Sequence, residues 1–323
     1  MDFTLTEEQV LLRATARRLL SAECPPSLVR GHIQDRSLAG PEGLWRHLRE
    51  WTALGAGPLT DLCLFLEETG AVAAPGPFFA TTVLWAPLAG HHAGTGTVAL
   101  AGANGEWTVN GEPVKTFVLD ADLVERVAFV VGTEDRPRLG IGAPGNRREV
   151  GMLDPSRRVF EVTVPDDLQT TELDPSTLRE LLARAWVALA AEMLGTSRWI
   201  FDHSLEYAKH REQFGRPIGS FQALQHKLAN MALVHERAWA AVYYAAMTID
   251  AGDPERFRAA HVAKATAGEA ARLCGKDGIQ IHGGVGFTWE HDLHLFLRRS
   301  FGSEHLLGTT DWHYDQLADL VLV

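Results

Sequence analysis

Side chains that can transfer protons are concentrated near the end of the chain, in the segment FGSEHLLGTTDWH from Phe301 to His313. The segment contains two carboxylates, Glu304 and Asp311, and two histidines, of which the first is His305. Carboxylates and imidazoles are common general acids and bases, because their pKa values can be tuned toward neutral pH. The segment is therefore a candidate acid/base site or the remains of one, depending on the elements around it.

Two other stretches combine charged residues with glycines. The first, YAKHREQFGRPIGSFQ, begins at Tyr207 and breaks a long helical pattern at a glycine and a proline. Arg211 stands at this break, where it can stabilise the terminal carbonyl groups of the helix, and spacing alone leaves a functional role equally open. The second, GIQIHGGVGFTWEHDLHLFLRR, contains Gly283 and Gly284, which let a backbone approach a bulky ligand. It follows no predicted strand, so the dinucleotide fingerprint of a parallel sheet does not apply.

The composition excludes several classes of protein. With 323 residues, 46% of them apolar, the chain can bury a large core in more than one domain. A formal charge of −11 without any basic run argues against nucleic acid binding, which depends on neutralising phosphates. No apolar stretch reaches the ~20 residues that span a bilayer, and MDFTLTEEQ is acidic, so we expect no membrane insertion and a cytoplasmic location. Cys24, Cys63 and Cys274 lie far apart, which favours apolar packing over a disulfide or zinc site.

Hydrophobic periodicity divides the chain into three parts. Residues 1–93 follow a helical pattern, in which Thr6 and Gln9 form a capping box and Gly70 is a plausible helix stop. Residues 94–170 alternate as strands do, and Asn110-Gly111 predicts a hairpin turn within a small antiparallel β-domain.

Residues 171–323 carry long helical repeats that are typical of an antiparallel bundle. We expect these helices to begin at Asp174, near Ser220 and at Asp253. The predicted fold class is therefore α+β, mainly α, in the order helical domain, β-domain and helical bundle.

The two glycine-containing stretches become specific when they are taken together. The motifs R-x-Q-F-G-x-P-I-x-x-F-Q, beginning at Arg211, and Q-I-H-G-G-x-G-F, beginning at Gln280, resemble those of the acyl-CoA dehydrogenase family. The resemblance extends to MDFTLTEEQ and to the order of the three parts over nearly the entire chain. It implies an N-terminal helical domain, a middle antiparallel β-domain and a C-terminal four-helix bundle, assembled as dimers or dimers of dimers. It also implies FAD between subunits, with the flavin on one β-domain and the ADP part reached by a neighbour's C-terminal domain.

The resemblance assigns cofactor-binding roles residue by residue. Arg211 matches the arginine that reaches the FAD pyrophosphate across the interface, and Phe214 and Gln222 match its companions beside the adenosine. Gln280, Gly283 and Gly284 match the turn against which the same cofactor packs. Thr309 is also expected to bind the cofactor. His226 and His282 lie near this region, and we expect both to be structural.

The positions that match the family's flavin-binding stretches and its catalytic base carry different residue types in this sequence. The first flavin clamp of the family, a Thr-Glu-Pro-x-x-Gly-Ser-like stretch, is missing, and Lys115-Thr116-Phe117 replaces the second. The family glutamate that removes the α-proton of the acyl thioester corresponds to Leu307, and the alternative helical position corresponds to Ala185. Neither side chain can accept a proton. Three nearby carboxylates remain as displaced candidates for the base, namely Glu192, Glu304 and Glu180.

The combined losses predict a subunit that completes a partner's site. Actinobacterial acyl-CoA dehydrogenases for steroid side chains or ring remnants form α2β2 heterotetramers with one degenerate subunit type, and the chain is similar to that subunit. The implied partners are a homologous flavin-competent subunit, an acyl-CoA substrate, and an electron-transfer flavoprotein or similar acceptor. Two alternatives remain: a self-sufficient homo-oligomeric dehydrogenase with a displaced glutamate base, and a non-catalytic scaffold or acyl-CoA-binding protein.

Overall fold

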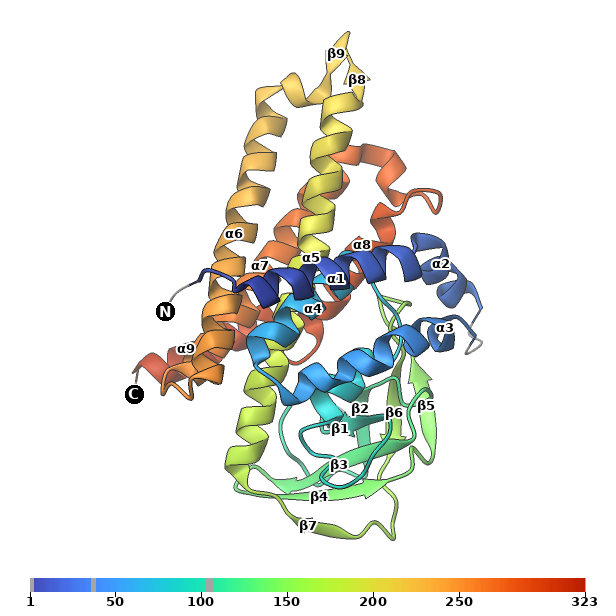
Figure 1. Ribbon diagram of the computed structural model, residues 1–323, viewed down its shortest axis with the longest axis vertical. Helices are drawn as coiled ribbons and strands as arrows, with labels where there is room; N and C mark the ends of the chain where they lie inside the picture. Colours follow the sequence, from blue (N-terminus) through green and yellow to red (C-terminus); the bar gives the residue numbers. More distant parts are fainter. Residues whose placement is uncertain (1–2, 36–38, 103–106, 323) are drawn as a thin grey trace.

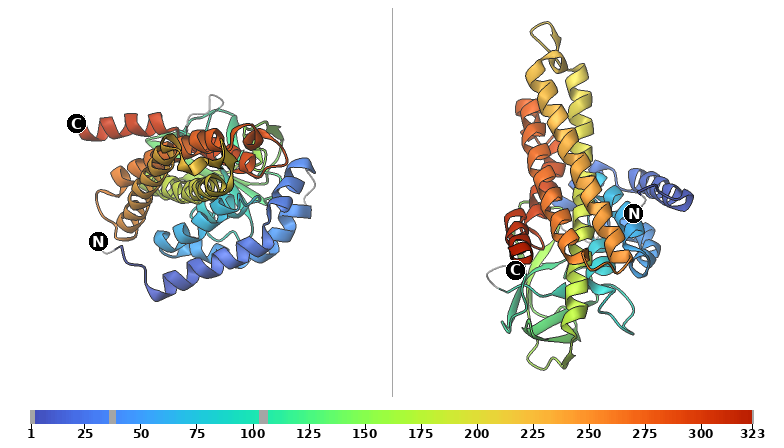
Figure 2. Two further views of the ribbon diagram at one scale, coloured as in Figure 1. Left: turned by 90° about the horizontal axis from the view of Figure 1, so that it is seen from above. Right: turned by 90° about the vertical axis from the view of Figure 1, so that its left-hand side faces the viewer.

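The computed structural model describes residues 3–35, 39–102 and 107–322. Figure 1 shows a tall helical bundle, a small β-domain at its lower end, and N-terminal helices that cross the side of the bundle. The views in Figure 2 show the same arrangement, with the long helices running side by side. The predicted fold class, α+β and mainly α in this order of parts, is confirmed.

The N-terminal part is helical, as its periodicity predicts. Its elements are α1 (Glu7–Glu23), α2 (Pro26–Gln34), α3 (Ala39–Leu48), the 3-10 helix η1 (Arg49–Ala56), α4 (Leu59–Ala71) and the π-helix η2 (Ala80–Trp85). The capping box is present, because the Thr6 hydroxyl accepts from the Gln9 N–H at 3.3 Å and the Gln9 side chain accepts from the Thr6 N–H at 3.2 Å. These bonds satisfy two donors at the start of α1.

The predicted helix stop at Gly70 agrees with the structure to within one residue, but the glycine serves a different purpose. Helix α4 continues to Ala71, and a Cβ at Gly70 would lie 1.9 Å from the carbonyl oxygen of Glu192 in helix α5 (Pro175–His210). A Cβ at Gly195 of α5 would lie 1.8 Å from the carbonyl oxygen of Glu67. The two glycines instead allow the backbones of α4 and α5 to touch.

The middle part forms two small sheets. Its strands are β1 (Gly96–Ala99), β2 (Val114–Leu119), β3 (Arg126–Thr133), β4 (Arg136–Gly142), β5 (Arg147–Val150), β6 (Val159–Thr163) and β7 (Thr170–Glu172). The sheet orders are β1-β3-β4-β7 and β2-β6-β5. All these pairs are antiparallel as predicted, except that β1 and β3 run parallel.

The predicted hairpin at Asn110-Gly111 is wrong. Among the described residues between β1 and β2, none belongs to a strand. The Nζ atom of Lys115 donates to both the backbone oxygen and Oδ1 of Asn110, each at 2.7 Å. Because the Lys115 side chain is buried, it needs these acceptors, and they hold Asn110 in a loop.

The C-terminal part contains the long helices that the repeats predict. Besides α5, its elements are β8 (Glu212–Gln213), β9 (Arg216–Pro217), η3 (Ile218–Ser220), α6 (Gln222–Asp250), α7 (Arg256–His282), η4 (Gly283–Phe287), α8 (Leu293–His305) and α9 (Thr310–Leu322). Asp174 caps α5 by accepting from the Ser176 N–H at 2.8 Å, as expected. Helix α7 begins at Arg256 rather than at Asp253, whose carboxylate instead accepts from the N–H of Glu255.

The parts share one large core, which fixes their relative positions. Asp250 at the end of α6 accepts from the N–H groups of Leu59 and Thr60, and so caps α4 from across the molecule. The cysteines Cys24, Cys63 and Cys274 are free and buried, as expected. Over the described residues we find no helix that could cross a bilayer and no cluster of metal-ligating side chains.

Candidate functional site

The two glycine-containing stretches meet at one end of the bundle. The Tyr207 ring, one turn before Arg211, stacks on the His282 ring with centroids 4.4 Å apart. His282 directly precedes Gly283, where α7 ends. The contact therefore places Arg211 and the glycine turn in one region, at the upper end of the bundle in Figure 1. Sequence motifs seventy residues apart form a single surface.

Most of the predicted cofactor-binding side chains on this surface are free to bind. Arg211, Gln222 and Gln280 are exposed, and none of the three side chains has a hydrogen bond or ion pair within the described part of the chain. Phe214 is 93% exposed and has φ +56, which is uncommon for a large side chain. Residues in such strained conformations cluster at active sites and ligand-binding sites.

The glycine turn shows a similar openness. Gly283 has φ +64, so its backbone conformation requires glycine. Gly284 has no such φ, and a Cβ added there would meet nothing within 4 Å. The packing of this chain alone therefore does not demand glycine at position 284. A close external neighbour is one physical reason for its small size.

The other candidates, His282, His226 and Thr309, have different surroundings. His282 is buried and its Nδ1 lies 2.9 Å from the carbonyl oxygen of Gly278, which agrees with a structural role. His226 is exposed on α6. The Thr309 hydroxyl accepts from the N–H of Trp312 at 3.2 Å, which caps the start of α9 and leaves the hydroxyl hydrogen as its free donor.

The positions that correspond to the family base are closed. Leu307 is 1% exposed with φ +57, and Ala185 is fully buried. The carbonyl oxygen of Leu307 lies 3.1 Å from Nε2 of His313, and the next carbonyl, that of Gly308, accepts from Lys264 at 2.9 Å. Because both side chains are buried, a thioester cannot reach them in this conformation.

Aromatic rings fill the space around these positions. We call Trp186, His261, Trp312 and His313 the aromatic cluster. The Trp186 ring lies 4.4 Å from His261 and 5.3 Å from His313, measured between centroids. The two imidazoles share a hydrogen bond of 2.8 Å between their Nδ1 atoms. The aromatic cluster is a packed core.

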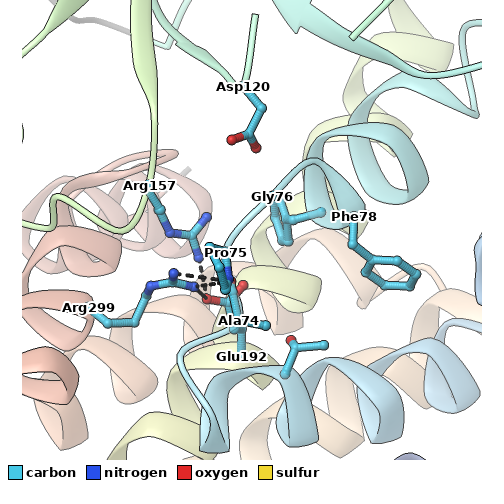
Figure 3. A pocket seen from close by; sticks show the side chains of 10 residues that line it. Ala74, Pro75, Gly76, Phe78, Asp120, Arg157, Glu192 and Arg299 are labelled. Atoms are coloured by element: carbon cyan, nitrogen blue, oxygen red, sulfur yellow. Dashed lines mark hydrogen bonds and ion pairs between the residues drawn. The ribbon is translucent and has the colours of Figure 1, made fainter. Parts of the chain in front are cut away.

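Glu192 is held in a buried ionic network. One of its carboxylate oxygens accepts from Arg299 at 2.9 Å and also from Arg157 (Figure 3). Arg299 also pairs with Asp154 at 2.7 Å. Burial raises the pKa of Glu192, but the two guanidinium groups outweigh it, so the net pKa lies below the usual value. A carboxylate that is stabilised as an anion and enclosed by two arginines is a weak base, which favours a structural role.

The network borders a small cavity at the junction of the three parts. The cavity, lined also by Gly76, Phe78 and Asp120, has a volume of about 20 Å³, room for about one water molecule. Figure 3 shows the Asp120 carboxylate pointing toward Arg157 across this space. Burial raises the pKa of Asp120 to about 7. The cavity is far too small for an acyl-CoA chain or a flavin ring.

The remaining carboxylates are also engaged. Glu304 accepts from the N–H of Thr310 at 2.9 Å. Burial raises the pKa of Glu304, but the hydrogen bonds from Thr310 and the nearby His305 and Lys264 together outweigh it, so the net pKa lies below the usual range. Glu180 pairs with Arg256 at 2.5 Å on the bundle surface. Asp311 is exposed and faces Arg272. Within the terminal segment, Glu304 lies 3.1 Å from Nδ1 of His305, whereas Asp311 pairs with Arg272 instead, so the two carboxylates do not share a site.

The second flavin-clamp position lies within strand β2, at an irregularity in its pairing with β6. Lys115 and Thr116 are buried, and Phe117 has φ +53. The Phe117 ring stacks on Trp107 with centroids 5.9 Å apart. Burial lowers the pKa of Lys115 to about 8. The place of the first clamp includes residues 103–106, which lie outside the described residues.

Comparison with known proteins agrees with this geometry. Residues 177–322 match the family described as acyl-CoA dehydrogenase, C-terminal domain. The chain is 32% identical over 322 residues to the acyl-CoA dehydrogenase IpdE2 of Mycobacterium tuberculosis, and the match covers 94% of each protein. The chain belongs to the acyl-CoA dehydrogenase family. It is also 32% identical to FadE34 of the same organism, of which it spans 47%.

Solved structures of the family have the same fold. The steroid acyl-CoA dehydrogenase Tcur3481-Tcur3483 superposes with a TM-score of 0.87 at 26% identity, over 99% of both chains. The ChsE4-ChsE5 complex of Mycobacterium tuberculosis gives a TM-score of 0.87 at 22% identity, over 100% of this chain and 99% of that one. The second likeness shows the fold alone.

Several buried residues of this member of the family cannot be found by reading motifs. Arg157 belongs to the ionic network, Lys264 binds the terminal loop and His261 binds His313, but none of the three lies in the two motifs that carry the resemblance. Arg299 ends the FLRR segment, yet its partner Asp154 is 145 residues away. What marks these residues is that a charged or polar side chain is buried, and burial becomes known only with the structure.

The aromatic cluster predicts acid sensitivity. Burial lowers the pKa of His261 from 6.5 to about 4 and that of His313 from 6.5 to about 2. Below pH 6.5 the unfolded chain therefore binds protons that the folded chain excludes, so the free energy of unfolding decreases as the pH is lowered. For His261 this decrease continues down to about pH 4. Urea unfolding between pH 7 and 4 measures this loss as a slope of ~1.4 kcal/mol per pH unit for each histidine.

A matched variant isolates this contribution. His261→Phe keeps an aromatic ring against Trp186 and removes one titrating group, so its stability is expected to depend less steeply on pH. An equal slope in the variant and the wild-type protein would contradict the assignment. His226→Phe, which changes an exposed histidine, is the control and is expected to leave the slope unchanged.

Proposed function

We propose that this chain is the non-catalytic subunit of a cytoplasmic heterotetrameric acyl-CoA dehydrogenase, and that it completes the FAD site of a homologous, flavin-competent partner. FAD, when bound, supplies the oxidant for α,β-dehydrogenation of an acyl-CoA thioester, and an electron-transfer flavoprotein or similar acceptor then removes the electrons. The residues of this chain bind the nucleotide part of the cofactor. They move no proton of the substrate.

The burial of Leu307 is the observation that carries the proposal. General base catalysis requires a proton acceptor within hydrogen-bond reach of the substrate. Leu307 offers none, and its position is sealed by the packed core and by the bonds that Lys264 and His313 make to the adjacent carbonyl groups. Restoring a base would therefore require opening the terminal loop as well as changing the side chain.

The exposed surface at the upper end of the bundle supports the second half of the proposal. Arg211 supplies a guanidinium group without a partner in the described residues, and Phe214 supplies an exposed ring. These groups fit the diphosphate and adenosine of FAD, since guanidinium binds phosphate with charge-assisted hydrogen bonds and aromatic rings stack on bases. The β2 residues from Lys115 to Phe117 do not fit the flavin in the same way, because Lys115 turns inward to Asn110.

A relation to steroid-type substrates is part of the proposal. The similar structure Tcur3481-Tcur3483 is a steroid acyl-CoA dehydrogenase. Its name and the name of the ChsE4-ChsE5 complex each combine two proteins. We infer a bulky acyl-CoA whose pocket lies in the partner subunit.

The flavin content of the native assembly tests the proposal. The complex purified from its host is expected to contain two kinds of related subunit. It is expected to bind one FAD for each pair of this chain and its partner, because this chain has lost its own flavin-binding site. The chain expressed alone is expected to be colourless. A chain that binds one FAD by itself and oxidises acyl-CoA would instead establish the homo-oligomeric alternative. In that case Glu192→Gln or Glu304→Gln would abolish the activity.

A further inference from the structure

The hairpin β8–β9 gathers donor groups on one face. Glu212 pairs with Pro217 and Gln213 pairs with Arg216, and the N–H of Ile218 donates to the carbonyl oxygen of Arg211. Residues that are directly opposite, or two apart on one strand, share a face of a β-ribbon. Arg211, Gln213 and Arg216 therefore share one face, and the carboxylate of Glu212 lies on the other.

The turn of this hairpin is built at an energetic cost. Phe214 and Gly215, its two central residues, have φ +56 and φ +77. Such a turn matches the twist of the strands, but phenylalanine in the left-handed region costs roughly 1 kcal/mol. The turn places Arg216 opposite Gln213 and diagonal to Arg211. The hairpin stands at the end of the bundle (Figure 1).

Arg216 is oriented by an aromatic ring. Its guanidinium lies over the Phe221 ring at 4.1 Å from the centroid, and Phe221 in turn meets Phe214 edge-on at 6.1 Å. A guanidinium that stacks on a ring keeps its N–H groups in its own plane, pointing outward. The Phe221 ring thus fixes the plane of the Arg216 guanidinium, and its N–H groups remain free to donate.

Neither of these two arginines has a carboxylate partner within the described chain, unlike several other exposed arginines. Arg148, Arg237 and Arg258 each pair with a glutamate on the surface. Two unpaired guanidinium groups on one ribbon face are unexpected in a chain whose formal charge is −11. They make a local site for a dianion, and a diphosphate presents one negative charge on each phosphate.

From this geometry we infer that Arg216 is a second ligand of the FAD diphosphate, so that Arg211 and Arg216 bind one phosphate each. The inference rests on the proposed function and adds a residue to it. Gln213 is placed between the two arginines and supplies an amide donor to the same group, although one of its N–H groups already bonds to the carbonyl oxygen of Glu212.

The test measures FAD affinity in the native assembly. The complex is stripped of flavin and titrated with FAD, and the change in flavin fluorescence gives the dissociation constant. Arg216→Ala is expected to weaken FAD binding about tenfold or more, as the loss of a charge-assisted contact does. Arg216→Lys is expected to recover part of this loss, because lysine keeps the charge without the fork of donors. Lys209→Ala, which removes a nearby cation paired with Glu206, is the control.

The outcomes separate this inference from the proposed function. Weaker FAD binding in both Arg211→Ala and Arg216→Ala supports the inference. Weaker binding in Arg211→Ala alone overturns it and leaves the proposed function intact, whereas unchanged binding in both variants overturns both. A raised KM for acyl-CoA with unchanged FAD affinity in Arg216→Ala would assign the arginine to the diphosphate of coenzyme A and would also overturn the inference. Because Arg216 is exposed, all variants are expected to unfold at the wild-type temperature.

Discussion

Replacing Arg299 by alanine is expected to lower the free energy of unfolding by about 3 to 5 kcal/mol, because it leaves buried carboxylates without their counter-charge. The Arg299 guanidinium donates to Asp154 at 2.7 Å, to Glu192 at 2.9 Å and to the hydroxyl of Ser156 at 2.8 Å. It also donates to the carbonyl oxygen of Ala74 at 3.1 Å. These partners come from the β-domain, α5 and the loop after α4, so one side chain joins all three parts.

Charge and burial decide the size of this effect. Arg299 is 2% exposed, and its neighbours Glu192 and Asp154 hold its pKa above the ordinary arginine value despite the opposing effect of burial. An exposed ion pair contributes only ~0 to 1 kcal/mol, whereas a broken buried pair leaves an unsolvated charge. The loss is therefore expected to exceed that of any surface arginine.

Urea unfolding at pH 7 measures this prediction. The adjacent Arg298, whose guanidinium lies 5.0 Å from the Trp289 ring centroid, provides the matched control, and Arg298→Ala is expected to change stability by less than ~1 kcal/mol. If Arg299→Ala and Arg298→Ala had the same midpoint, the network would not hold the three parts together. If Arg299→Ala failed to fold at all, Arg299→Lys, which keeps the charge, would still give a measurable intermediate loss.

Replacing Arg211 by alanine is expected to weaken FAD binding to the native assembly about 10- to 100-fold, the usual loss for a charge-assisted hydrogen bond to phosphate. The stability of this chain is expected to remain unchanged, since the Arg211 side chain is exposed and has no partner in the described residues. The backbone of Arg211, which accepts from Ile218 and donates to Tyr207, is preserved by the substitution.

The flavin content after dialysis and the FAD dissociation constant both report this change. Arg148→Ala, which removes an exposed arginine of the β-domain that pairs with Glu161, is the control and is expected to retain all FAD. The non-catalytic scaffold alternative expects equal flavin content in both variants. That result would remove the cofactor-sharing role from this chain.

The two predictions concern different ends of the same long helix. Helix α5 carries Glu192 in the buried network and ends at the exposed hairpin that presents Arg211. The glycine contacts at Gly70 and Gly195 fix this helix against α4. The rigid core thus positions the exposed hairpin, and the hairpin itself can remain free for a partner.

The sequence by itself determined the elements and the surface that depend on local patterns. The capping box at Thr6, the long helices and the break at Gly215 follow from neighbours within a few residues, so periodicity and turn chemistry predict them. The exposed state of Arg211, Phe214 and Gln280 agrees with their assignment by motif, because a motif that serves a partner needs no contact within its own chain.

Only the tertiary structure decided what the carboxylates and the glycines inside the helices do. Glu192 is a plausible base by its position in the chain, but its partner Arg299 lies 107 residues away and turns it into a structural anion. By sequence Gly70 resembles a helix stop, but in the structure it lies against the carbonyl group of Glu192. Asn110 resembles a hairpin residue, but it binds the ammonium group of Lys115. Ionisation and close packing depend on desolvation by distant segments, which a linear pattern does not contain.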